Sequence, residues 1–351
     1  MTQLPASLSH LPQIVQQNCH IADAAQATNY TLCVYLMKMR EYYRWEKGYG
    51  FGERLSSEAV GEWLRKREAL WEELEDQPFQ PLTINGRDYP PFEADAINEQ
   101  LEAHGLLYSA GLGYGNSAHF FLGKRVQSEQ QEDFRVLIAD TELARDLSAP
   151  PALSQGRVIY IRRESLRRMI WEKLEEWRWS RLDNAMGRAL GAYDFDHDFD
   201  QALQQMTAAE TRTVLNHELG EIMAGERLGD SWEEMLIQIP THRTQLLLRL
   251  VRDNLADCLS TLPQLLHGDQ PPSSLHFYIA TLSNLRKHLF PGLVAAYQYW
   301  LESGDPEKFK SIIDRGRTHW QQVAEQVMSE FSAAGATADS KIAGLIEDNA
   351  L

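Results

Sequence analysis

Tyr30-Thr31-Leu32-Cys33-Val34-Tyr35-Leu36-Met37 is an almost wholly apolar stretch that ends at Lys38. A helix of this composition has apolar side chains in every direction, so we expect it to be buried on all sides at the centre of a bundle. A membrane-spanning helix needs about 20 consecutive apolar residues, and this stretch is far shorter. The stretch therefore predicts the core of a helical bundle and no membrane span.

The segments around this stretch also read as helices. Residues 11–75 predict two long helices, and the second, over 57–75, is amphipathic. From about Glu164 to Phe331 the pattern is helical again, with stops at glycine and proline positions that divide it into helices of ordinary length. The chain is therefore expected to be mainly α.

A short part of the chain between these helical regions predicts β-structure. Leu82-Thr83-Ile84 precedes Asn85-Gly86, a dipeptide typical of a tight hairpin turn. Residues 92–104 predict a helix that Gly105 closes, and further strands are expected at 106–109, 118–122, 134–139 and 158–161. The predicted fold is a multi-helix bundle with a small antiparallel α+β insertion. Its expected parts are an N-terminal helical part (1–77), a small α+β domain (78–162), a C-terminal helical domain (163–332) and a loosely ordered tail (333–351).

The net charge and the cysteine content argue against some classes of protein. The formal net charge of the 351 residues is −16, which argues against nucleic-acid binding because that depends on Lys and Arg at phosphates. The only cysteines, Cys19, Cys33 and Cys258, form no CxxC pair, and the first residues lack a basic segment before an apolar run. We expect a reduced, cytoplasmic protein whose partner is another protein or an anionic small molecule.

Two helical stretches carry a family resemblance. The sequence from Asn29 to Glu46 (NYTLCVYLMKMREYYRWE) and the sequence from Arg163 to Trp177 (RESLRRMIWEKLEEW) resemble an uncharacterised family of bacterial hypothetical proteins. That family carries no assigned biochemistry. The resemblance implies a bacterial, cytosolic origin and supplies no site.

His217-Glu218-Leu219-Gly220-Glu221 is the strongest candidate site. His217 and Glu221 are four residues apart, so on a helix they point the same way and could share one metal ion, iron or manganese. The alternative is an ordinary surface pair, because Leu215 and Leu219 suggest that the opposite side of this helix faces the core. Gly220 and its small neighbours favour the close approach of a second helix on the side of His217.

Glu41 is the expected third metal ligand, supplied by a facing helix. Its alternative role is a salt link within its own helix to Lys38 or Arg44. If the segment around these residues is enclosed, its charges must be paired or have shifted pKa values. A ferritin-like site is not expected, because no Glu-x-x-His occurs in the chain.

Arg167 and Arg168 belong to a locally basic segment with several tryptophans, which predicts an anion-binding surface. The alternative is a normal amphipathic helix with an i, i+4 ladder of charges. Without a P-loop or a Gly-x-Ser-x-Gly motif, the sequence does not decide whether this protein is an enzyme. Two functions therefore stay open: a noncatalytic binding or interaction protein, or a metal-dependent helical oxidoreductase that uses His217 and Glu221.

Overall fold

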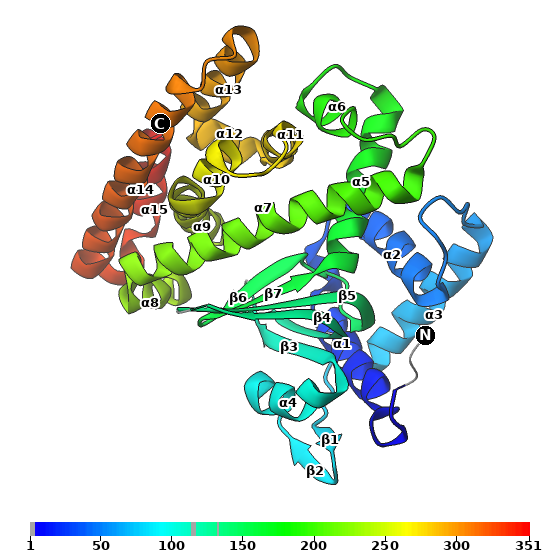
Figure 1. Ribbon diagram of the computed structural model, residues 1–351. Coiled ribbons are helices and arrows are strands. Elements are labelled where there is room, and N and C mark those ends of the chain that lie inside the picture. The colour runs from blue at the N-terminus through cyan, green and yellow to red at the C-terminus, as the bar shows by residue number, and fades with distance from the viewer. Residues whose placement is uncertain (1–3, 114–116, 132) are drawn as a thin grey trace. The chain divides into compact units, whose positions relative to one another are not determined.

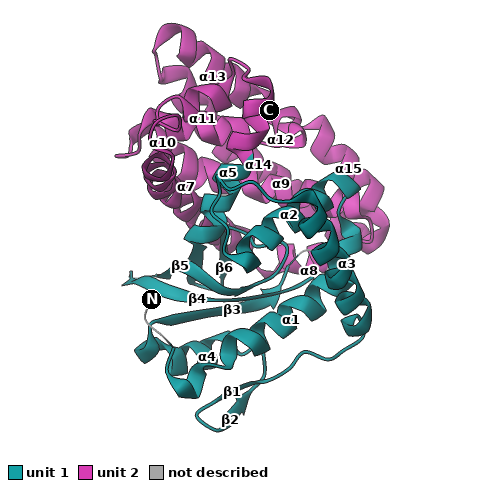
Figure 2. Cartoon of the chain, turned by 90° about the vertical axis from the view of Figure 1, so that its right-hand side faces the viewer, with its two compact units in different colours: residues 1–172 teal, residues 173–351 magenta. Residues whose placement is uncertain are grey.

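The structure, a computed structural model, describes residues 4–113, 117–131 and 133–351 (Figure 1). The chain forms two compact units, residues 1–172 (unit 1) and residues 173–351 (unit 2), which Figure 2 colours separately. None of the helices in the described ranges is long and apolar enough to cross a membrane.

Unit 1 begins with three helices, where the sequence predicted two. They are α1 (Leu11–Gln26), α2 (Leu32–Lys47) and α3 (Ser57–Leu74). Gly48, in the left-handed conformation with φ of 69°, ends α2, and the Ser56 side chain caps α3. Tyr42, Trp63 and Trp71 form a buried aromatic cluster between α2 and α3.

The first half of α2 is not buried, so the prediction of a central bundle helix is wrong. Leu32 is 70% exposed, Leu36 45% and Met37 57%. The charged second half of the helix is enclosed instead, with Glu41 and Arg44 both buried. A helix that is apolar on all sides is expected to pack against another surface. The sequence of so short a stretch does not show which surface that is.

The β-structure of unit 1 is larger than the small antiparallel insertion that the sequence predicted. The expected hairpin of β1 (Leu82–Ile84) and β2 (Arg87–Tyr89) is confirmed, with positive φ at Asn85 and Gly86. The main sheet has five strands in the order β3-β4-β5-β7-β6, and β5 and β7 run parallel. Its strands are β3 (Leu106–Leu112), β4 (Ala118–Gln130), β5 (Arg135–Arg145), β6 (Ala152–Gln155) and β7 (Val158–Arg162). The mixed pairing arises because β6 and β7 form a hairpin that places β7 beside β5.

Alternating residues of the sheet contribute to separate apolar clusters. Tyr108, Phe120 and Leu122 pack with α1 and with α4 (Ala94–Leu101). Leu107, Phe121 and Tyr160 belong to a second cluster. This is the period-2 alternation of a sheet that is buried on both faces.

Unit 2 is built from helices around one large apolar cluster. Helix α5 (Arg163–Ser180) crosses the boundary between the units. The helices that follow are α6 (Ala185–Leu190), α7 (Phe199–Leu228), α8 (Asp230–Gln238), α9 (His242–Ala256), α10 (Leu262–His267), α11 (Pro272–Thr281), α12 (Asn284–Leu289), α13 (Pro291–Ser303), α14 (Glu307–Ala334) and α15 (Asp339–Asp348). The expected loose tail at 333–351 instead contains α15, because Ile342 and Ile346 form a buried stripe one turn apart.

Candidate metal centre

Helix α7 carries His217 and Glu221 on a side where a second helix packs closely. The Asp198 side chain caps its N-terminus, and the helix continues for 30 residues. A Cβ atom on Gly220 would lie 2.3 Å from the backbone oxygen of Ala256, so only glycine permits this approach of the two segments. The expected packing role of Gly220 is therefore confirmed, and the side of α7 that bears His217 is not a solvated surface.

The facing segment supplies two carboxylates that the sequence analysis missed. Asp253 lies in the last turn of α9, and Asp257 begins a π-helical turn that covers Asp257–Thr261. The two residues are four positions apart and lie on either side of Ala256, whose backbone packs against Gly220 of α7. Single π-turns are rare and occur frequently at functional sites.

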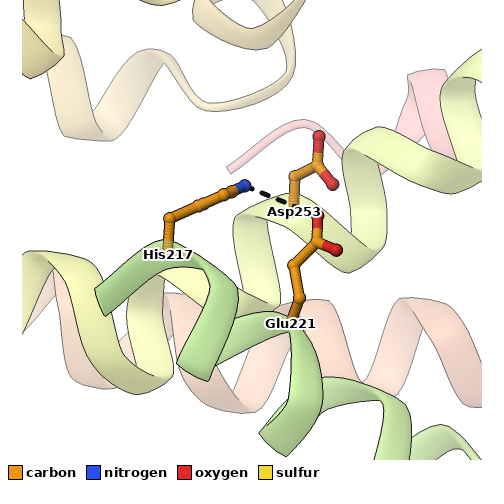
Figure 3. Close-up of side chains that lie close together, drawn as sticks. All are labelled: His217, Glu221 and Asp253. Carbon is orange, nitrogen blue, oxygen red and sulfur yellow. Dashed lines mark ion pairs between the residues drawn. The ribbon is translucent and has the colours of Figure 1, made fainter. Parts of the chain in front are cut away.

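His217, Glu221 and Asp253 converge on one point (Figure 3). Their ligand atoms, one from each side chain, all lie within 4.8 Å of one another. His217 Nε2 and Glu221 Oε1 are 3.4 Å apart on α7, and the Asp253 carboxylate comes from the facing helix. All three residues are partly buried. One imidazole nitrogen and two carboxylates form a donor set that suits a first-row transition metal.

Asp257 forms a hydrogen bond with Nδ1, the other ring nitrogen of His217. Asp257 Oδ1 is 2.8 Å from His217 Nδ1, while Tyr278 and Arg286 both donate hydrogen bonds to Asp257 Oδ2. Metal-bound histidines commonly donate the second ring N–H to a carboxylate in this way, which leaves the opposite nitrogen for the ion. The arrangement fixes the orientation of the His217 ring.

The pKa values of His217 and Glu221 show that a metal ion would replace a proton on His217. Burial alone would lower the pKa of His217, but the carboxylates of Asp257 and Glu221 outweigh burial and hold that pKa well above its ordinary value. Burial would likewise raise the pKa of Glu221, but His217 and Arg252 lower it to about 2. Without a metal ion, a protonated His217 therefore lies between two ionised carboxylates.

Asp253 differs from Glu221 and Asp257 in its hydrogen bonds. Glu221 accepts a hydrogen bond from Arg252, and Asp257 accepts one from Arg286. Among the residues that the structure describes, the Asp253 carboxylate forms no hydrogen bond or ion pair. Burial raises its pKa, and the nearby charges of His217, Arg286 and Arg252 oppose this rise only in part. Nearby cations therefore stabilise this carboxylate only at a distance, and a metal ion bound between it, His217 and Glu221 would stabilise it directly.

Glu41, the third ligand that the sequence predicted, belongs to unit 1. Its carboxylate is buried, and its two oxygens accept hydrogen bonds from Arg40 Nε and Arg44 Nε. This is the alternative role that the sequence analysis gave it, an ion pair within its own helix. The cluster in unit 2 takes its third ligand from Asp253 instead.

The two arginines of the predicted anion site have different environments in α5. Arg167 is partly exposed and donates a hydrogen bond to Asp140. Arg168 is buried, donates to the backbone oxygen of Glu41 and lies 3.5 Å from Glu164. Both guanidinium groups therefore have acidic partners already.

Unit 1 also contains a buried charge network that no sequence motif indicated. Glu142 accepts hydrogen bonds from Arg162 Nε and Ser165 Oγ, and it lies 3.7 Å from Arg145. Burial would raise the pKa of Glu142, but the neighbouring arginines lower it. Asp140 and Glu142 alternate with other residues along β5, a pattern compatible with a solvated face, so the sequence alone gives no sign that these charges are enclosed.

The fold and the cluster define a two-unit protein, mainly helical, with a candidate metal centre in its second unit. The chain belongs to a family of unknown function, DUF6866: the model of the N-terminal domain of that family matches residues 10–162, and the model of its C-terminal domain matches residues 167–349. The expected resemblance to an uncharacterised family is thus confirmed. No curated protein and no solved structure matches the sequence.

Proposed function

We propose that this protein binds one divalent transition-metal ion, iron or manganese, through His217, Glu221 and Asp253 of unit 2. The observation that carries the proposal is the convergence of three donor atoms within 4.8 Å from two helices. The Asp253 carboxylate supports it further, because among the described residues it forms no direct hydrogen bond or ion pair and a bound cation would neutralise it.

The mixed donor set favours a transition metal over calcium or magnesium. Calcium and magnesium prefer oxygen ligands alone, whereas an imidazole nitrogen suits iron and zinc and carboxylates suit manganese. With the ion on Nε2, His217 keeps its proton on Nδ1 and donates it to Asp257. Asp257 then acts as a positioning residue, and it does not itself bind the ion.

Two forms of this function use the same ligands. In the first, the protein is a noncatalytic binding protein, and the ion links α7 to α9. In the second, it is a metal-dependent oxidoreductase, because three protein ligands leave coordination positions open for a small molecule. Loading with iron(II) and following its absorption spectrum during exposure to dioxygen separates the two, since only the second form requires oxidation faster than that of free iron(II) in the same buffer.

Equilibrium dialysis against Mn²⁺ tests the binding step. The wild-type protein is expected to take up one equivalent, and Asp253→Asn, which removes one charged ligand and keeps the shape of the side chain, is expected to weaken binding by about tenfold or more. Asp348→Asn is the matched control, because Asp348 is exposed at the end of α15 and loses the same charge. Equal Mn²⁺ binding by the Asp253 and Asp348 variants would refute the assignment.

We also propose that the protein acts in the cytoplasm of a bacterial cell. Its three cysteines are free thiols, and structural disulfides are typical of oxidising compartments. Its negative charge disfavours nucleic acid as a partner.

A further inference from the structure

A groove in unit 1 is separate from the metal centre in sequence and in chemistry. It lies where the end of α1, the start of α2 and the end of α3 meet, and its volume is about 480 Å³. Its apolar lining includes Tyr30, Leu32, Tyr35 and Trp71. A volume of this size is in the range that bound ligands and anchoring side chains occupy.

The apolar surface continues from the groove along α2. Leu32 lines the groove and is 70% exposed, and Leu36, one turn further along the same side of α2, is 45% exposed. Hydrophobic residues that are exposed singly need no explanation, but a contiguous row beside a groove marks an interaction site. Hydrophobic residues spaced three to four positions apart are also the pattern that binds another helix.

The acidic rim of the groove specifies the charge of the occupant. Glu68, Glu72 and Glu75 line it from consecutive turns of α3 and its C-cap. Tyr35 donates a hydrogen bond to Glu68, but none of the three carboxylates has a cationic partner among the described residues. Like charges three and four residues apart destabilise a helix, so this row disfavours the isolated unit and favours a cationic ligand.

We propose that this groove docks a basic amphipathic helix of a partner protein. The apolar face of that helix covers Leu32 and Leu36, and its Lys or Arg side chains pair with Glu68, Glu72 and Glu75. A second copy of this chain would bring another strongly negative molecule to an acidic groove. An anionic lipid surface would be repelled for the same reason. The proposal does not depend on metal binding.

A labelled model peptide tests the proposal on the full chain. The probe is a fluorescein-labelled helix of about five turns with Leu on one face and Lys on the other, and its control carries Glu in place of Lys. Fluorescence anisotropy at physiological salt is expected to show binding of the Lys peptide alone.

Three variants locate the binding surface. Glu68→Gln/Glu72→Gln/Glu75→Gln and, separately, Leu32→Ser/Leu36→Ser are each expected to weaken binding by about tenfold or more. The charge-matched control neutralises three exposed glutamates of unit 2, as Glu234→Gln/Glu302→Gln/Glu325→Gln. It is expected to change the affinity for the peptide by less than about twofold.

Three results would overturn the proposal. Equal weakening by the unit 2 control would mean that the peptide senses only the overall charge of the protein. Unchanged binding by the Leu32/Leu36 variant would remove the apolar face from the site. A concentration-dependent dimer in sedimentation that the same variant abolishes would make a second copy the occupant. Thermal unfolding of each variant separates these outcomes from loss of the fold.

Discussion

Metal affinity should rise steeply with pH, because the ion must displace a proton from His217. The carboxylates of Asp257 and Glu221 hold the pKa of His217 well above its ordinary value, so the imidazole is protonated near neutrality without a metal ion. Each bound ion then releases one proton, and the dissociation constant for Mn²⁺ should fall about tenfold per pH unit, or about 1.4 kcal/mol, until the folded pKa of His217 is reached. Glu221, with a pKa near 2, adds no proton in this range.

Isothermal titration calorimetry measures this linkage directly. Titrations with Mn²⁺ at pH 6, 7 and 8, each in two buffers of different ionisation enthalpy, give both the affinity and the number of protons released. In the metal-free protein the raised folded pKa of His217 stabilises the fold. This contribution is complete below the unfolded pKa and is lost as pH rises through the folded value. An affinity that stays constant from pH 6 to 8, with no proton released, would refute the assignment of His217 as a ligand.

Three further predictions concern packing and buried charge. Gly220→Ala should destabilise the fold by about 1–3 kcal/mol, because the new Cβ would lie 2.3 Å from the Ala256 oxygen; Gly225→Ala, which meets no atom within 4 Å, should instead stabilise α7 by up to about 1 kcal/mol in urea unfolding. Burial raises the pKa of Glu210 to about 7, so Glu210→Gln should stabilise the protein at pH 8 by up to about 3 kcal/mol. This gain should be lost as the pH falls from 7 to the unfolded pKa near 4.5. If the variant and the wild type differed in free energy of unfolding by the same amount at pH 8 and at pH 4, this reasoning would be contradicted. Glu142→Gln should lower the free energy of unfolding by about 3–5 kcal/mol, since it leaves buried guanidinium groups without their counter-charge, and a variant as stable as wild type in urea would be incompatible with the network.

The sequence predicted the helices and strands that have a clear hydrophobic period or a distinctive turn. The prediction failed where the pattern of side chains carries little information. The β1–β2 hairpin follows from Asn85-Gly86, since both residues readily adopt the positive φ that the turn requires. Strand β6 was missed because it follows two prolines and Leu153 is its only large aliphatic residue. The apolar composition of the start of α2 predicts a core position. Composition alone cannot distinguish a helix that is buried within the chain from one that leaves an apolar surface exposed.

The candidate metal site was half predictable. The i, i+4 spacing of His217 and Glu221 follows from helix geometry alone. Asp253 and Asp257 share the same spacing, and this pair in an apolar helix was a signal that could have been used. That the two pairs face each other depends on the contact between Gly220 and Ala256, which is set by tertiary packing and leaves no local pattern.

Elemental analysis of the purified protein tests the central claim most directly. Protein prepared without chelators and passed over a chelating resin to remove loosely bound ions should retain close to one equivalent of iron or manganese, and His217→Ala, purified in parallel, should retain almost none. Wild-type protein without a stoichiometric transition metal that also fails to take one up from solution, or a His217→Ala variant with full metal content, would contradict the account.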